Sequence, residues 1–199
     1  MNAMAGKPEQ WATGRADEPR PALLIRSIRP SDAEALRIFH AGLSDEVNQR
    51  YFGARSELDD DDLRWFTCVD GADRLAVAAF DGVRLVGLSR ADRLSDQVDA
   101  EVAVVVDDAH REQGIGTALL ERLIDDARGI GIGVFEADVW TSDRRVRSVF
   151  HHLGFRVRSS RDVDVARLVF LIGPSATYEL ACRKRRRALA FEITYGIEP

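Results

Sequence analysis

One stretch, Asp99 to Leu123, constrains the fold of this chain more than any other. Val102 to Val106 are apolar and mostly β-branched, which predicts a buried strand that begins at about Glu101. The turn that follows contains Gly114 and Gly116, and a helical pattern of apolar residues begins there. A strand that enters a helix through such a turn directs free backbone N–H groups to one point, at the positive end of the helix dipole. The stretch therefore predicts a binding site for an anion, typically a phosphate.

The composition limits the classes of protein that are compatible with this stretch. The chain has 199 residues, of which 45% are hydrophobic, and this is enough for one domain with a full core. Its net charge of −5 argues against a dedicated nucleic-acid binder. Cys68 and Cys182 are far apart, and the adjacent His151 and His152 lack the spacing of two metal ligands on one helix face. We therefore expect neither a disulfide framework nor a metal, and a reducing cytoplasm fits.

No segment is predicted to address the chain to a membrane. The sequence holds no apolar run close to the roughly 20 residues of a membrane helix. Residues 1–21 lack the apolar centre of a signal peptide and are expected to form a flexible tail. We therefore expect a cytoplasmic protein with no nucleic-acid or membrane partner.

Residues 22–173 are predicted to form one α+β domain, with a mixed, mostly antiparallel sheet flanked by helices. The expected order is strand, helix, helix, three strands, helix, strand, helix and two strands. The corresponding ranges are 23–28, 31–43, 56–69, 74–80, 84–88, 101–106, 114–128, 134–140, 143–153, 155–158 and 166–172. Asp81-Gly82 indicates a hairpin between two of the strands. The acidic run Asp59 to Asp62 is interpreted as a solvated helix start rather than a metal site.

Residues 174–199 are expected to be a C-terminal extension. It contains the basic run Arg183 to Arg187, for which a charged, solvated tail is the favoured interpretation. Binding of this run to an acidic partner, as a protein-interaction module, is the alternative.

Two well-known phosphate-binding motifs fit the glycine turn poorly. A dinucleotide-binding unit needs a third glycine, and the position three residues after Gly116 is Leu119. A P-loop needs a lysine after its last glycine, and the sequence has none at that place. The run Arg111-Glu-Gln-Gly114-Ile-Gly116 instead resembles the Arg/Gln-x-x-Gly-x-Gly/Ala motif of the GNAT acyltransferase superfamily. The acidic residue at the start of the preceding strand and the later Gly154-Phe155 pair also match, and the resemblance covers about Leu23 to Ile172.

The resemblance implies an enzyme that transfers an acetyl group from acetyl-CoA and that uses no metal. In this family the strand before the motif holds the pantetheine arm, and the N–H groups of the turn hold the pyrophosphate. The resemblance thus places the pantetheine on Val104, Val105 and Val106, and the pyrophosphate on Gln113, Gly114, Ile115, Gly116 and Thr117. Independently, Arg111 offers a cation and a bidentate donor to a phosphate.

A narrower resemblance concerns the acceptor. Leu43 to Gly53, with Ala100-Glu-Val-Ala, is similar to the acetyltransferase domain of bacterial protein lysine acetyltransferases of the Pat type. This similarity implies a lysine side chain as the acceptor. The acceptor is therefore expected to be a primary amine, either a protein lysine or a small molecule.

Glu101 is the candidate catalytic base. An attacking amine must be neutral, so a base or a water relay has to take its proton. Glu101 begins the strand that should line the acyl site, we expect it to be partly buried, and the matching residue in the Pat group is an acid with that role. The alternative is an edge carboxylate paired with an arginine. Asp99 is a second candidate, and Asp107 and Asp108 lie at the far end near the cofactor turn.

The sequence departs from the family's pattern at the residue that acts as the general acid. Many members carry Tyr four residues before the glycine of Gly-Phe, and this sequence has Phe150 there. The common Asn after the next strand is replaced within Thr141-Ser142-Asp143, and His151 and His152 are expected to be surface residues. A non-catalytic acyl-CoA-binding sensor is therefore the alternative to an enzyme.

The segment Arg50-Tyr51-Phe52 falls where the family builds its acceptor pocket. Tyr51 and Phe52 are expected to be core residues more than substrate contacts. The sequence leaves the oligomeric state open, with a homodimer among the options.

Overall fold

The computed structural model describes residues 22–53, 55–95, 98–141, 149, 153, 157–161, 165–188 and 192–196, with the backbone alone at 157–161 and 186–188. In these ranges the strands form one eight-stranded sheet in the order β6-β7-β5-β4-β3-β2-β1-β8. The strands are β1 Ala22–Ser27, β2 Arg74–Asp81, β3 Arg84–Arg93, β4 Asp99–Val106, β5 Val134–Trp140, β6 Val157–Arg161, β7 Val165–Leu171 and β8 Glu192–Tyr195. The helices are η1 Pro30–Asp32, α1 Ala33–Ala41, α2 Asp45–Phe52, α3 Asp60–Thr67, η2 Asp108–His110, α4 Ile115–Gly129 and α6 Ala176–Ala188.

The sheet is mixed and mostly antiparallel, as predicted. β1, β2, β3 and β4 are antiparallel to their neighbours in that series, and β7 is antiparallel to both β5 and β6. Parallel pairing joins β4 to β5 and β1 to β8. Gly82 has φ 59° in the turn between β2 and β3, which only glycine adopts readily, so the predicted Asp81-Gly82 hairpin is confirmed.

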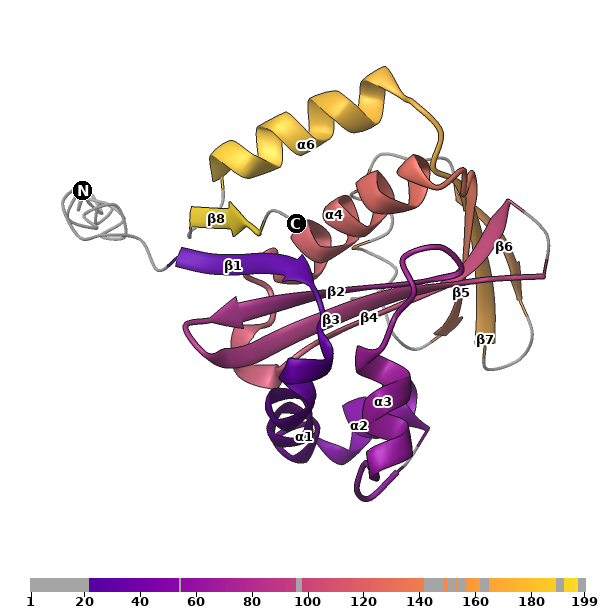
Figure 1. The fold of residues 1–199 in the computed structure, drawn as a ribbon. Coiled ribbons are helices and arrows are strands. Elements are labelled where there is room, and N and C mark those ends of the chain that lie inside the picture. The colour runs from indigo at the N-terminus through magenta and orange to yellow at the C-terminus, as the bar shows by residue number, and fades with distance from the viewer. Residues whose placement is uncertain are drawn as a thin grey trace, which may run out of the picture.

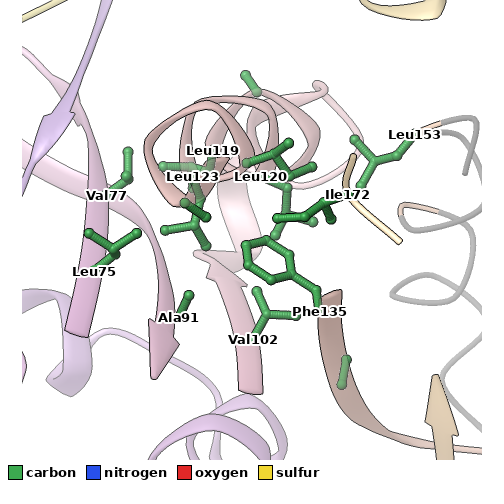
Figure 2. Close-up of a cluster of buried hydrophobic side chains, with 14 of the residues drawn as sticks. Leu75, Val77, Ala91, Val102, Leu119, Leu120, Leu123, Phe135, Leu153 and Ile172 are labelled. Atoms are coloured by element: carbon green, nitrogen blue, oxygen red, sulfur yellow. The ribbon is translucent and has the colours of Figure 1, made fainter. Parts of the chain in front are cut away.

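Helices cover both faces of the sheet. In Figure 1, α4 and α6 lie above the sheet, and α1, α2 and α3 lie below it. Leu119, Leu120 and Leu123 of α4 are fully buried and belong to one hydrophobic cluster with Val102 of β4 and Phe135 of β5 (Figure 2). A leucine-rich helix face over β-branched and aromatic strand residues accounts for this layer.

The second hydrophobic cluster lies on the opposite face, beneath β1 to β4. Its members come from the helices before β2 and from the alternate strand positions: Leu36, Phe39, Phe52, Leu63, Phe66, Ala76, Ala78, Phe80, Leu88 and Val105 are among them. Phe52 contacts Phe66 edge to face, with ring centroids 5.0 Å apart. These helices therefore cover the β1–β4 half of that face.

One glycine sets how closely α4 approaches the sheet. A Cβ built on Gly87 of β3 would lie 2.9 Å from Cδ1 of Leu119 and 3.2 Å from the carbonyl oxygen of Val105. Ordinary side chains do not tolerate such distances, so α4 packs on backbone at this point. This contact fixes the position of the first turns of α4.

The acidic run is the start of α3. The carboxylate of Asp59 accepts hydrogen bonds from the backbone N–H groups of Asp61 and Asp62, at 3.0 and 2.8 Å. Asp62 in turn accepts from the backbone N–H of Asp59 and completes a capping box. The interpretation as a helix start is therefore confirmed.

Several segments differ from the prediction. β3 extends to Arg93, beyond the expected 84–88, and β8 adds a strand from the expected C-terminal extension to the sheet. Residues 45–52, for which no helix or strand is predicted, form α2, which ends at Gly53 in the left-handed conformation with φ 71°. The basic run, expected to lie in a solvated tail, belongs to α6, which packs on α4. Tyr178 is 1% exposed there, and Nε of Arg185 donates to Oε1 of the buried Glu121 at 2.7 Å. A charged sequence can form a packed helix when one stripe of it is buried.

Candidate active site

The site forms at a fork between two parallel strands. β4 and β5 pair at Asp99–Val134, Ala100–Phe135 and Glu101–Glu136. Beyond Glu101 and Glu136 both strands continue, but within the described residues no further register pair joins them. The two strands therefore diverge after the Glu101–Glu136 pair.

The open side of β4 presents backbone hydrogen-bonding groups. The N–H of Asp107 donates to the carbonyl of Val86 on the β3 side, and the carbonyl of Val98 accepts from the N–H of Val134 on the β5 side. Backbone groups alternate along a strand, so those of Val104 and Val106 face the side where β5 has diverged. The backbone of Val105 faces β3, and its side chain is 4% exposed in the cluster below the sheet. Val104 and Val106 can thus hydrogen-bond an extended ligand in the fork.

The cofactor loop, defined here as residues 107–114, leads from β4 into α4. Its backbone has positive φ at Glu112, 61°, and at Gly114, 89°. The first helical hydrogen bond of α4 runs from the N–H of Ala118 to the carbonyl of Gly114, at 3.0 Å. The N–H groups of Ile115, Gly116 and Thr117 precede that bond and lie at the positive end of the helix dipole. They provide the donors that an anion needs.

Gly116 lies directly over β4. A Cβ built there would lie 3.5 Å from Cγ2 of Val106 and 3.8 Å from Cγ2 of Val104, so the helix start and the open strand edge meet at this point. Nη1 of Arg111 is 2.9 Å from Oδ1 of Asp108, and the side-chain amide of Gln113 donates to the carbonyl of Ala109 at 3.2 Å. Arg111 is thus a partly exposed cation beside the start of α4.

Glu101 is exposed, so the expected partial burial is wrong. Its partner in register, Glu136, faces the same side of the sheet. The Glu101 carboxylate is open to solvent on that side, below β4. Among the described residues, no hydrogen bond or ion pair within 4.0 Å joins the Glu101 carboxylate to another group, but Glu101 interacts electrostatically with Arg167 of β7. Asp99 is partly buried at the start of β4.

Glu101 belongs to a row of charged residues across the sheet. Arg74 of β2 pairs in register with Asp92 of β3, Asp92 with Glu101, and Glu101 with Glu136. Arg74 Nε and Arg90 Nε each lie 3.5 Å from an oxygen of Asp92. Asp92 is thus compensated by two arginines.

An aromatic wall borders this row. The guanidinium of Arg90 lies 4.4 Å from the ring centroid of Trp65 and 5.9 Å from that of Tyr51. Arg74 lies on Trp65 as well, at 4.5 Å. Burial raises the pKa of the Tyr51 hydroxyl above its usual range, so it stays protonated near neutral pH. Phe52 is 1% exposed in the core, as expected, and Tyr51 packs beside it at 4.8 Å between ring centroids.

The face of β5 and β7 next to Glu101 is open. Arg167 of β7 forms a bidentate pair with Asp138 of β5, with both N–O distances at 2.9 Å, and this pair holds the pKa of the Asp138 carboxyl below its usual range. Nη1 of Arg167 is 3.8 Å from the carboxylate of Glu136. Trp140 and Leu171 are 42% and 67% exposed. This face combines carboxylates with exposed apolar side chains.

Sequence reasoning missed Asp92, Glu136 and Arg167. The alternation of polar and apolar residues along each strand was the available signal, because each of the three lies at a position that points away from the buried side of its strand. Their grouping depends on strand register, which the sequence pattern does not reveal. Phe150, His151, His152, Ser142-Asp143 and Gly154-Phe155 lie outside the described residues.

The described residues contain neither a metal-binding cluster nor a membrane-spanning helix. In that part of the chain, no group of three or more His, Cys, Asp or Glu side chains is placed to hold a metal ion. No helix in the same ranges combines the length and the apolar character needed to cross a bilayer.

Comparison with known proteins agrees with this geometry. Residues 41–155 match the acetyltransferase (GNAT) family. The GNAT domain of Pat from S. lividans is similar, with 34% sequence identity and a TM-score of 0.69 over 74% of this chain and 89% of that domain. The putative acetyltransferase yncA from Salmonella typhimurium, solved with its cofactor acetyl-CoA, has the same fold, with 23% identity and a TM-score of 0.63 over 77% and 96% of the two chains. A cAMP-binding acyltransferase from Mycobacterium smegmatis matches at 25% identity and a TM-score of 0.55, over 81% of this chain and 48% of that one. This chain belongs to the GNAT family of acetyltransferases.

Proposed function

We propose that this enzyme acetylates the side-chain amine of a protein lysine, with Glu101 as the general base. Membership of the GNAT family makes the chain an acetyl-CoA-dependent N-acetyltransferase. To this we add the class of acceptor, the residues that bind acetyl-CoA and the residue that takes up the proton. The observation that carries the proposal is the exposed Glu101 carboxylate at the point where β4 and β5 diverge.

The residues at the fork fit the donor. Backbone groups of Val104 and Val106 suit the amide-rich pantetheine arm. The N–H groups of Gly114, Ile115, Gly116 and Thr117, supported by Gln113 and the cation of Arg111, suit the pyrophosphate. Val105, which the resemblance included, contributes its side chain to the core. Acetyl-CoA supplies a thioester carbon that a neutral amine can attack.

Glu101 takes up the proton that the acceptor has to lose. A lysine arrives as an ammonium ion, and the carboxylates of Glu101 and Glu136 attract it to the fork. Glu101, directly or through water, removes one proton, and the free amine attacks the thioester carbon. The new C–N bond forms as the C–S bond breaks, the nitrogen loses its second proton to solvent, and the leaving thiolate takes up a proton from solvent. Val102, the next residue along β4, packs in the cluster with the α4 leucines, so the Glu101 side chain faces the opposite side of the sheet and the acceptor approaches from that side.

The open face of β5 and β7 favours a polypeptide over a small amine. Exposed Trp140 and Leu171 beside Glu136 and Asp138 can contact residues that flank a lysine, and carboxylates suit a basic segment. A small amine would need little of this surface.

The test compares the wild type with Glu101→Gln on a protein extract and labelled acetyl-CoA, with acetyl-lysine mapped by mass spectrometry and free thiol release measured in parallel. Glu34→Gln, an exposed carboxylate on α1, is the control for charge. We expect acetyl-lysine with the wild type and the control, and at least about a 100-fold lower rate with Glu101→Gln. Undiminished activity of Glu101→Gln would contradict the base assignment, acetylation of small amines alone would contradict the acceptor class, and tight CoA binding without turnover would support a sensor.

A further inference from the structure

We propose that Asp107, which takes no part in the chemistry, positions the cofactor loop and thereby sets the affinity for coenzyme A. The inference rests on the proposed function only in taking the pyrophosphate of acetyl-CoA as the ligand of that loop. Asp107 follows the last residue of β4 and is 5% exposed. A carboxylate buried beside an anion site is unfavourable on charge grounds, so its contacts have to compensate.

The Asp107 carboxylate joins three parts of the chain. Oδ1 accepts a hydrogen bond from the backbone N–H of His110 at 2.9 Å and lies 2.7 Å from Nδ1 of the same residue. Oδ2 accepts from Nη2 of Arg84, at the start of β3, at 2.8 Å. The backbone N–H of Asp107 donates to the carbonyl of Val86. One side chain thus ties the end of β4 and the first turn of the loop to β3.

Basic side chains face both oxygens of the Asp107 carboxylate. Arg84 compensates one oxygen, and Nδ1 of His110 lies 2.7 Å from the other. Nε2 of His110 lies 4.0 Å from Oδ2 of Asp81, so the ring lies between the carboxylate at the end of β2 and that of Asp107, which follows β4. The neighbouring Asp108 pairs with Arg111 and accepts from the backbone N–H of Ser44 at 3.2 Å. The loop is therefore anchored to β3 through Arg84 and to the segment before α2 through Ser44.

Anchoring matters because the rest of the loop is strained. Glu112 has φ 61°, a conformation that non-glycine residues adopt at a cost of order 1 kcal/mol or more. Without the Asp107 contacts, the segment 107–110 can relax, and the N–H groups of the turn and of α4 no longer converge on one point. Glu101 lies six residues back along β4, about 20 Å at ~3.3 Å per residue. Loss of Asp107 should therefore weaken cofactor binding and leave the rate of acetyl transfer at saturation unchanged.

The experiment measures the dissociation constant of coenzyme A by calorimetry, and the KM for acetyl-CoA and kcat with one fixed acceptor. We expect Asp107→Ala to weaken CoA binding at least ten-fold, with kcat within two-fold of the wild type. Asp61→Asn, an exposed carboxylate on α3, is the control and should bind as the wild type does. His110→Asn, which keeps a donor near the position of Nδ1, should retain most of the affinity that His110→Ala loses.

Asp107 is buried, so its alanine variant can also unfold. Arg84→Gln decides that case, because the Arg84 side chain is 61% exposed and its loss leaves the core intact. We expect Arg84→Gln to weaken CoA binding with an unchanged melting temperature. If Arg84→Gln and Asp107→Ala bind coenzyme A as tightly as Asp61→Asn does, this inference is overturned and the proposed function is not affected. A wild-type protein that does not bind coenzyme A would overturn both this inference and the proposed function, whereas binding without acetyl transfer would leave this inference standing.

Discussion

Glu101 of β4 lies opposite Glu136 of β5, and this is the pair at which the two parallel strands are last in register within the described residues. Like charges opposite each other are unfavourable in a sheet. Asp92, on the other side of Glu101, is compensated by Arg74 and Arg90, and Glu136 is approached by Arg167. The site is therefore arranged to accept one further cation beside Glu101.

The first prediction concerns Glu136→Gln. Removal of one negative charge should raise the KM for a lysine-containing peptide by about ten-fold, since a charge-assisted contact of roughly 1.4 kcal/mol is lost. The KM for acetyl-CoA should not change, because Glu136 faces away from α4. Steady-state kinetics with both substrates varied checks this, with Glu34→Gln as the control for charge.

A variant with the opposite expectation sharpens this test. Arg167→Gln removes the cation that partly compensates Glu136, so it should lower the peptide KM. A rise in the peptide KM for both variants would contradict the role given to Glu136.

The sequence predicts the parts of this site that are consecutive along the chain, but not the parts that strand pairing brings together. The Gly-x-Gly turn, Arg111 and the strand before them are consecutive in sequence, so their pattern was sufficient to predict the start of α4 and its place after β4. The neighbours of Glu101 are not consecutive. Asp92 and Glu136 come from strands on either side, and their approach depends on how far β3 and β5 slide along β4. A shift of one residue would turn these carboxylates to the other face, and no residue pattern specifies that register.

The second prediction concerns Gly87→Ala. The added methyl would contact Leu119 and the Val105 carbonyl at distances that packed atoms avoid, so it should displace α4 and lower the free energy of unfolding by about 1–3 kcal/mol. Gly129→Ala is the matched control, because a Cβ there meets nothing within 4 Å and alanine favours the helix. Urea unfolding of both variants measures the difference. Equal stability of the two would show that α4 tolerates a wider separation from β3.

The third prediction concerns the contact of α6 with α4. Arg185→Met removes the guanidinium that lies 2.7 Å from the carboxylate of Glu121, a residue that is 2% exposed. We expect a loss of about 2 kcal/mol in the free energy of unfolding, because a buried charged acceptor loses a donor. Arg183→Met, at an exposed position of the same basic run, should change stability by less than about 0.5 kcal/mol. A similar effect of both substitutions would argue that general charge, rather than the contact with Glu121, matters.

The fourth prediction uses the two cysteines. Cys182 is 6% exposed between α6 and α4, and burial raises the pKa of its thiol from 9.0 to about 11. Because the thiolate is the nucleophile, iodoacetamide at mildly alkaline pH should modify the exposed Cys68 and spare Cys182. Mass spectrometry of the digested protein distinguishes the two sites. Rapid labelling of Cys182 in the folded protein would mean that α6 leaves α4 readily.

The same shift gives a pH dependence of stability. The folded state holds the Cys182 proton more tightly than the unfolded chain, so its contribution is complete below pH 9. The free energy of unfolding should then fall as the pH rises from 9 to about 11. Cys182→Ala should lack this component of the pH profile.

The fold was predictable where the signals were local. Asp81-Gly82 specified a hairpin, and the leucines of α4 specified an amphipathic helix. α2 was missed because its apolar residues are few, and its burial comes from Phe52 packing on helices and strands distant in sequence. α6 was missed for a related reason: its basic run suggested a solvated segment, while Tyr178 and Cys182 supply a buried stripe that only the presence of α4 makes useful.

The parallel pairing of β1 with β8 has a consequence for synthesis. β1 leaves the ribosome first among the strands, and β8, its outer neighbour, leaves last. While the chain is being made, β1 is therefore an open edge with unpaired N–H and C=O groups, the kind of edge that other nascent chains can join. Protection of that edge has to wait until Tyr195 has emerged, so a nascent chain that has not yet reached β8 is the form most exposed to aggregation and to chaperone capture.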